Sequence, residues 1–119
     1  MRRRLAAATV LLTVLTSVTA CSGDDGGGST EVKTITVNLE GDKATPTGDR
    51  VDVDVNQPVD IDITADRAGQ IHVHSSPGQY FDFKAGDNDP IKLQFDRPGK
   101  VEIEFHEPID APIVELLVQ

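Results

Sequence analysis

The sequence predicts an all-β domain, an antiparallel Greek-key β-sandwich of seven or eight strands. Over residues 31–119, apolar side chains alternate with polar ones at every second position, which is the periodicity of strands with one buried face. Turns rich in Pro, Gly and Asp separate the alternating runs. Nowhere in this range do apolar residues recur at helical spacing for more than one turn. Together these observations favour two packed antiparallel sheets.

The first twenty residues are predicted to be a signal peptide rather than part of the fold. Residues 2–4 are arginines, and the apolar stretch 5–15 is too short to span a bilayer comfortably. The sequence Val18-Thr19-Ala20-Cys21 resembles the bacterial lipobox, in which a small residue precedes an obligatory cysteine. The resemblance implies that Cys21 is acylated on sulfur, becomes the new N-terminus and anchors the protein to the extracytoplasmic face of the membrane. A plain secretory peptide with a chance cysteine is the alternative.

Residues 21–30 are predicted to form a flexible Gly/Ser/Asp tether, which leaves residues 31–119 as the folded domain. Processing would remove Met1, the only methionine, and acylation would occupy Cys21, the only cysteine. The mature chain would then offer no free thiolate, no thioether and no internal disulfide. The stability of the domain must therefore come from its apolar core.

The charge of the chain excludes one class of partner. The net charge is −9, and cleavage after residue 20 would leave eight Lys and Arg against 20 Asp and Glu, a net charge of −12. Nucleic-acid binding needs a basic face that displaces phosphate counterions, and this sequence has none. Membrane attachment must come from the lipid, because anionic headgroups repel an acidic body.

The first half of the domain contains four predicted strands. Residues 35–39 place Ile, Val and Leu on one face. Residues 51–55 alternate valine with aspartate, and after an Asn-Gln-Pro turn at 56–58 the alternation resumes over residues 59–63. In residues 71–73, Ile and Val alternate with histidine.

The second half contains four more predicted strands. Residues 80–83 form a short aromatic segment before a turn. Residues 91–95 and 101–105 alternate on either side of an Arg-Pro-Gly turn. Residues 113–118 are apolar nearly throughout, which predicts a central or doubly covered strand.

The order of these segments resembles the cupredoxin fold, as found in a group of exported bacterial lipoproteins. One feature is the predicted hairpin 51–64, with Gln57-Pro58 where such domains usually have a turn glycine. Another is Ile-His-Val-His at residues 71–74, at the place where cupredoxins carry their first histidine ligand. A third is the stretch 97–106, which resembles the Pro-Gly-x-aromatic-x-aromatic-x-Cys strand that leads into the cupredoxin ligand loop.

The sequence also departs from the cupredoxin pattern. Phe105 occupies the position of the copper-ligating cysteine, and His106 follows it directly instead of several residues later. The loop 107–112 supplies no methionine. A blue-copper site needs a thiolate and two imidazoles, usually with a weak axial ligand. Blue-copper electron transfer is therefore excluded for the mature chain.

The three histidines are the candidate metal ligands. His72 and His74 are two residues apart on a predicted strand, so they share one face at a spacing of about 6.6 Å. In the cupredoxin topology the strand that carries His106 is adjacent, so His106 could complete a three-histidine site for copper or zinc. Glu102 and Glu104 share the phase of His106 and could serve as a further ligand or as support.

Two other interpretations stay open. If the apolar residues at 71 and 73 face the core, the histidines face outward and could simply decorate a polar sheet face. The protein would then be a metal-free structural or protein-interaction module of the cell envelope. A metalloenzyme would need a pocket, for which the sequence shows no lid or substrate-binding loop, so no enzyme is predicted. The leading hypothesis is a membrane-tethered, extracytoplasmic module that binds copper or zinc.

Overall fold

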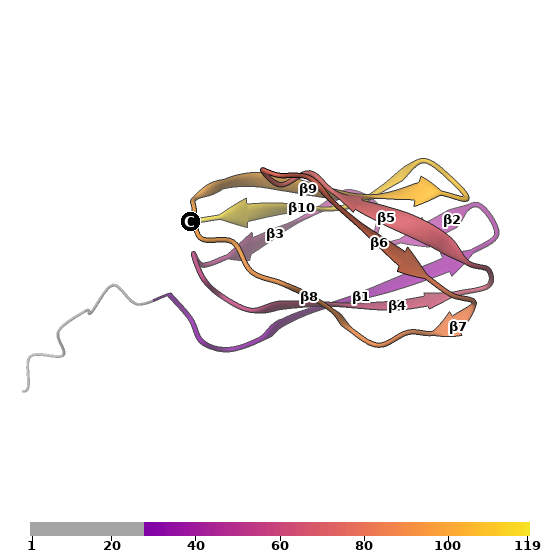
Figure 1. Cartoon of the computed structure of the whole chain (residues 1–119), viewed down its shortest axis with the longest axis horizontal. Helices are drawn as coiled ribbons and strands as arrows, with labels where there is room; N and C mark the ends of the chain where they lie inside the picture. The colour runs from indigo at the N-terminus through magenta and orange to yellow at the C-terminus, as the bar shows by residue number, and fades with distance from the viewer. Residues whose placement is uncertain (1–27) are drawn as a thin grey trace, which may run out of the picture.

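The computed structural model describes residues 28–119, which form two β-sheets packed face to face (Figure 1). No helix occurs among these residues, and so none that could cross a membrane. The predicted signal peptide, Cys21 and most of the predicted tether lie outside the described residues. The strands are β1 (Lys33–Glu40), β2 (Lys43–Thr45), β3 (Asp49–Val53), β4 (Val59–Ala65), β5 (Gly69–Val73), β6 (Gln79–Phe83), β7 (Gly86–Asp87), β8 (Ile91–Leu93), β9 (Gly99–Glu107) and β10 (Ala111–Val118).

The predicted all-β sandwich is confirmed. The first sheet has the order β2-β1-β4-β7, with β8 also paired to β4, and the second has the order β3-β10-β9-β5-β6. The apolar side chains of the alternating runs point between the sheets and form a single core, while the polar ones point outward. Among the described residues no polar or charged side chain is buried, so the core is apolar throughout. Its fully buried members with the largest side chains are Phe105, Leu39, Ile61, Ile63, Ile71, Ile103, Ile113 and Leu116.

The expectation that all strands pair antiparallel is wrong for two pairs. β1 runs parallel to β4, and β3 runs parallel to β10. Both parallel pairs have one partner from the segment 51–64, which was expected to form a hairpin. β3 and β4 instead lie in different sheets.

The turn between β3 and β4 accounts for this difference. Asn56 has a left-handed φ of 64°, a conformation that asparagine tolerates better than most residues. Its N–H donates to the carbonyl of Phe95 (2.8 Å), while the Gln57 N–H donates to the carbonyl of Asp54 (3.0 Å). The turn therefore carries the chain from one layer to the other. Alternation alone shows which side chains face the core but not which sheet a strand joins.

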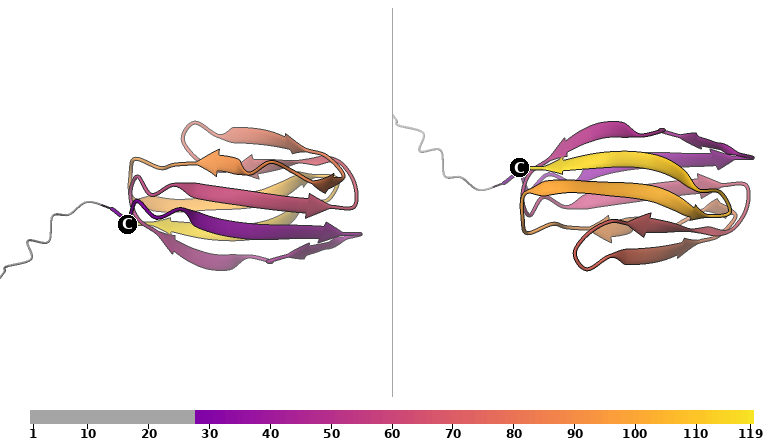
Figure 2. Two further views of the ribbon diagram at one scale, coloured as in Figure 1. Left: turned by 90° about the horizontal axis from the view of Figure 1, so that it is seen from below. Right: turned by 90° about the horizontal axis from the view of Figure 1, so that it is seen from above.

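The prediction of a central strand near the C-terminus is confirmed. In Figure 2, β10 (yellow) lies between β9 (orange) and β3. A bulge between Pro112 and Val114 interrupts its pairing with β9, and both Ile113 and Val114 are buried. Contact with strands on both edges and with the opposite sheet explains why this segment is almost uniformly apolar.

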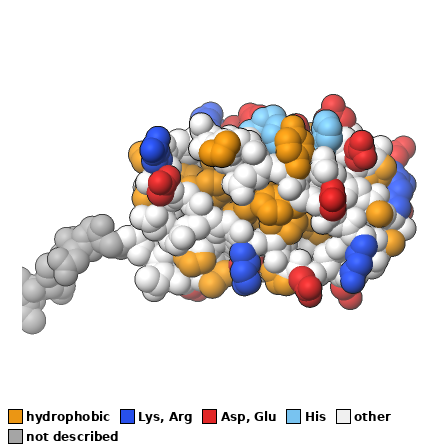
Figure 3. All heavy atoms as spheres, in the orientation of Figure 1, with side chains coloured by type: hydrophobic (Ala, Val, Ile, Leu, Met, Phe, Trp, Pro, Cys, Tyr) orange, Lys and Arg blue, Asp and Glu red, His pale blue; other side chains and the backbone are white. Residues whose placement is uncertain are grey.

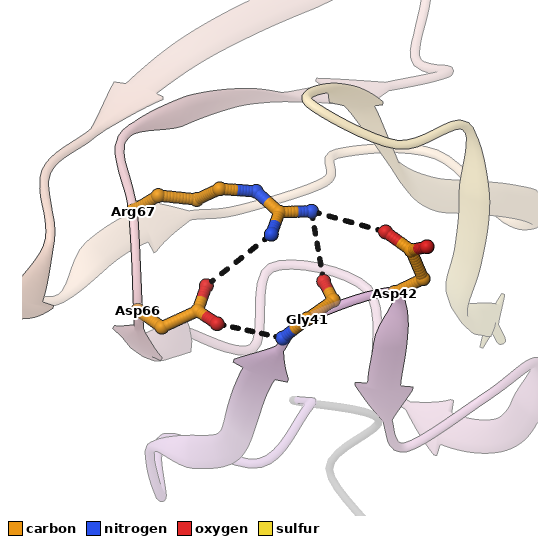
Figure 4. A network of polar contacts seen from close by, with 4 residues as sticks. All are labelled: Gly41, Asp42, Asp66 and Arg67. Atoms are coloured by element: carbon orange, nitrogen blue, oxygen red, sulfur yellow. Dashed lines mark hydrogen bonds and ion pairs between the residues drawn. The ribbon is translucent and has the colours of Figure 1, made fainter.

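A polar network joins two turns at one end of the sandwich (Figure 4). The Gly41 N–H donates to Asp66 Oδ2 (2.6 Å), and Asp66 in turn donates its N–H to the carbonyl of Leu39 (3.0 Å). Arg67 donates from Nη2 to the Gly41 carbonyl (2.8 Å) and forms ion pairs with Asp42 and Asp66. The β1–β2 turn is thereby fixed to the turn between β4 and β5, which precedes the strand carrying His72.

Replacing Asp66 should test this network. Asp66→Ala is expected to lower the free energy of unfolding by about 0.5–1.5 kcal/mol, because it removes the acceptor of a backbone N–H. Urea unfolding measures the change. Asp42→Ala is the matched control, because the Asp42 side chain is 91% exposed and its loss should change stability by less than about 0.5 kcal/mol. Equal losses in the two variants would contradict the assignment.

Candidate metal centre

Strand β5 and the residue directly after it present two histidines on the outer face of the second sheet. Ile71 and Val73 are fully buried in the core, so His72 and His74 between and after them point away from it. β5 lies between β6 and β9, and His72 stands opposite Glu104 of β9. The His74 N–H continues the ladder by donating to the carbonyl of Glu102 (2.8 Å). The outward orientation predicted for the histidines is confirmed.

His72, His74 and Glu104 bring three potential donor atoms together. Glu104 Oε1 lies 2.7 Å from His74 Nε2 and 3.6 Å from His72 Nδ1, and one donor atom from each residue lies within 4.8 Å of the other two. The His72 side chain is 17% exposed, the Glu104 side chain 28% and the His74 side chain 40%. The cluster is therefore partly buried at His72 and Glu104 and more open to solvent at His74.

This donor set suits a divalent ion. Imidazole nitrogen and carboxylate oxygen both bind zinc and copper(II), with bonds of about 2.0–2.2 Å, so donors about 4 Å apart can share one ion. The 3.6 Å separation between His72 Nδ1 and Glu104 Oε1 is close to this value, whereas the 2.7 Å between His74 Nε2 and Glu104 Oε1 is a hydrogen bond that an ion would replace. His72 and Glu104 stand opposite each other on paired strands, and His74 directly follows β5 and is hydrogen-bonded to β9, so small side-chain rotations suffice to bring the three donors onto one ion. Three protein ligands would leave a further position for water or another ligand.

The structure does not include His106 in this group. The β5–β9 register places Glu104, not His106, opposite His72. The pairing then shifts between Gln70 and Ile71, so His106 occupies the bulge of β9. Its ring lies edge-on to that of His72 with the centroids 6.4 Å apart. Glu104, expected as a further ligand or as support, thus takes the place in the cluster that was expected for His106.

Glu102, the other predicted supporting carboxylate, also lies outside the cluster. It is exposed on the outer face of β9, opposite Glu115 of β10. Hydrogen bonds from Arg50 and the charge of Lys100 hold the pKa of the Glu115 carboxyl below its usual value. Glu102, Glu104 and Glu115 line a shallow hollow of about 230 Å³ beside the cluster. Carboxylates on this face favour the approach of cations.

Phe105 has the opposite orientation to the candidate ligands. It is fully buried and packs edge-to-face on Phe83, with the ring centroids 5.6 Å apart. At the position where the resemblance places a thiolate ligand, this chain therefore has a core side chain that faces the other sheet.

Tyr80 is the neighbour that sequence reasoning missed. It lies on β6 directly opposite His72, and the two rings are stacked with centroids 4.2 Å apart and an interplanar angle of 5°. In Figure 3 the histidine side chains lie along the edge formed by the second sheet, with hydrophobic surface between them. The sequence marked Tyr80 only as part of an aromatic strand, because the β5–β6 register that pairs it with His72 cannot be derived from alternation.

Comparison with solved structures shows the kind of fold. No protein-family model and no curated protein matches this sequence. A copper binding protein, solved by NMR in the apo form, superposes with a TM-score of 0.55 and 14% identity over 77% of this chain and 94% of its own. The fold is cupredoxin-like.

Larger copper proteins contain the same cupredoxin-like architecture. A multicopper oxidase superposes with a TM-score of 0.51 at 14% identity, and a multi-copper oxidase from Pediococcus acidilactici with 0.51 at 13% identity. These matches cover 73% and 95% of this chain but only 44% and 30% of the oxidases. At such identities the likeness concerns the fold alone.

Proposed function

We propose that this protein is a metal-binding module of the cell envelope, which holds copper(II) or zinc with His72, His74 and Glu104. In this proposal the acyl chain on Cys21 anchors it to the extracytoplasmic face of the membrane, and residues 21–30 lift the sandwich from the surface. Its role is to bind the ion, and no catalytic step is assigned to it. Nucleic acid is not among its partners, because the net charge is −9.

The observation that carries the proposal is the convergence on Glu104 Oε1. A carboxylate oxygen between two imidazole nitrogens, at 2.7 and 3.6 Å, offers three donors to a single ion. The cupredoxin-like fold of a copper binding protein supports the proposal at the level of the scaffold. The donors differ from those of blue copper, since neither thiolate nor thioether is present in residues 22–119. Electron transfer of the blue-copper kind is therefore not proposed.

Calorimetric titration of the metal-free protein with copper(II), and separately with zinc, tests the proposal. The expected result is one-to-one binding tighter than about 1 μM. At a free-metal concentration of 100 times the Kd, stability should rise by about 2.7 kcal/mol, seen as a higher melting temperature. Binding only at millimolar concentrations, with no defined stoichiometry and no rise in melting temperature, would overturn it.

A metal-free interaction module is the second candidate, and one observation favours it. His74 Nε2 already hydrogen-bonds to Glu104, and His72 already stacks on Tyr80, so both imidazoles have partners without an ion. For such a module, neither chelators nor added metal would change the unfolding curve, because a ligand that does not bind the native state cannot stabilise it.

A further inference from the structure

The His72 ring is held on several sides. Tyr80 covers one face in a parallel stack at 4.2 Å. The ring of His74 lies tilted against it, with the centroids 3.9 Å apart. Because of these neighbours His72 is the least exposed of the three donor residues.

The two nitrogens of His72 face different surroundings. Nδ1 points toward Glu104 Oε1, at 3.6 Å. Nε2 lies against the backbone of Gly78, where an added Cβ would be only 3.2 Å away. A 180° turn of the ring about the Cβ–Cγ bond would put Cδ2 in the place of Nδ1, and it would require the ring to turn between Tyr80 and His74. The packing therefore favours the orientation that offers Nδ1 to the cluster.

Tyr80 itself is in an unusual place for a large aromatic side chain. It is 54% exposed, and among the described residues the only other exposed large hydrophobic side chain is Val32. Its ring also lies edge-on to His106, with the centroids 5.7 Å apart. Tyr80 thus contacts both His72 and His106 and contributes little to the core. Its ring contacts are therefore with the histidines on the outer face of the sheet.

We propose that Tyr80 is a positioning residue of the metal site, whose ring holds the His72 imidazole so that Nδ1 meets Glu104 Oε1 and His74 Nε2. This inference rests on the proposed function. The physical basis is preorganisation, because a ligand side chain that is already held in its bound rotamer loses less conformational entropy when the ion binds. His106, which was expected to be a ligand, instead packs edge-on against the ring of Tyr80.

Two substitutions of Tyr80 separate stacking from the other properties of the residue. In Tyr80→Ala, copper(II) affinity should fall about 2- to 10-fold, the range expected for loss of an aromatic pair. In Tyr80→Phe, which keeps the ring and loses only the hydroxyl, affinity should stay within about 2-fold of the wild type. Both variants should keep the urea unfolding midpoint of the parent, because Tyr80 is mostly exposed.

A spectroscopic readout tests orientation directly. In the zinc-loaded protein, proton–nitrogen correlation spectra of the imidazole rings identify the coordinating nitrogen of His72. We expect Nδ1 in the wild type and in Tyr80→Phe, and a mixture of Nδ1 and Nε2 in Tyr80→Ala. A role of Tyr80 in stability alone would not change which nitrogen binds.

Gly78→Ala gives an independent check on the donor atom. The new methyl group would lie against His72 Nε2 and make no other contact closer than 3.9 Å. If Nδ1 is the donor, metal affinity should stay within about 3-fold of the wild type, whereas donation from Nε2 predicts a loss of at least about 10-fold.

The outcomes distinguish this inference from the proposed function. Wild-type protein that binds no metal would overturn both. Wild-type protein that binds metal, together with Tyr80→Ala that binds equally well through the same nitrogen, would overturn the role of Tyr80 and leave the proposed function standing. Coordination of zinc by His72 Nε2 in the wild type would likewise overturn the inference alone.

Discussion

Phe105→Ala is expected to lower the free energy of unfolding by about 3–5 kcal/mol, the usual cost of truncating a fully buried phenylalanine. The loss has two causes. The apolar surface of the ring is no longer buried, and a cavity remains beside Phe83, its edge-to-face partner. Small domains have about 5–15 kcal/mol of stability in total, so this one substitution should bring the protein close to its unfolding transition. Urea unfolding at constant temperature gives the value.

Phe105→Leu is the control for this experiment. It keeps most of the apolar volume, and its cost should stay below about 1.5 kcal/mol. A loss of less than about 1 kcal/mol for Phe105→Ala would contradict the placement of this side chain in the core. The comparison of Phe105→Ala with Phe105→Leu bears on function too, because Phe105 stands where the cupredoxin pattern has its copper-ligating cysteine. A large loss would mean that this position supports the fold rather than a ligand.

Most of the sandwich could be predicted from the period-two pattern. In a strand, every second side chain faces the core, so runs such as 35–39 and 101–105 predict both a strand and its buried face. The run 113–118, apolar except for Glu115, predicts a strand with neighbours on both edges. The pattern does not specify the partner of each strand. It therefore could not show that the segment 51–64 crosses between sheets at Asn56, or that two pairs are parallel.

The candidate site could be predicted in part for the same physical reason. The spacing of His72 and His74 places both on one face, and the buried residues beside them place that face outward. The third donor depends on the register between β5 and β9, which a one-residue shift would change. That register, with the bulge at His106, brings Glu104 to the cluster. Tyr80 was missed because it depends on the β5–β6 register in the same way.

The double variant His72→Ala/His74→Ala is expected to weaken copper(II) and zinc binding by at least about 100-fold. Loss of a residue that only supports a ligand costs about 10–100-fold in metal affinity, so loss of two ligands should cost more. The fold should remain, because His74 is exposed, His72 lies on the outer face, and neither belongs to the core. Calorimetric titration measures the affinity, and urea unfolding checks that the two proteins are equally folded.

His106→Ala is the matched control for the double variant. Its ring is on the same face but outside the group of converging donors, so its removal should change affinity by less than about 10-fold, through Tyr80 alone. If His106→Ala abolished binding as completely as the double variant, the three-histidine site expected from the sequence would replace the site built on Glu104.

Glu104→Gln decides between these two arrangements, because it keeps the shape of the side chain and removes the charge. Because Glu104 converges with His72 and His74 and His106 does not, metal affinity should fall strongly in Glu104→Gln and only weakly in His106→Ala.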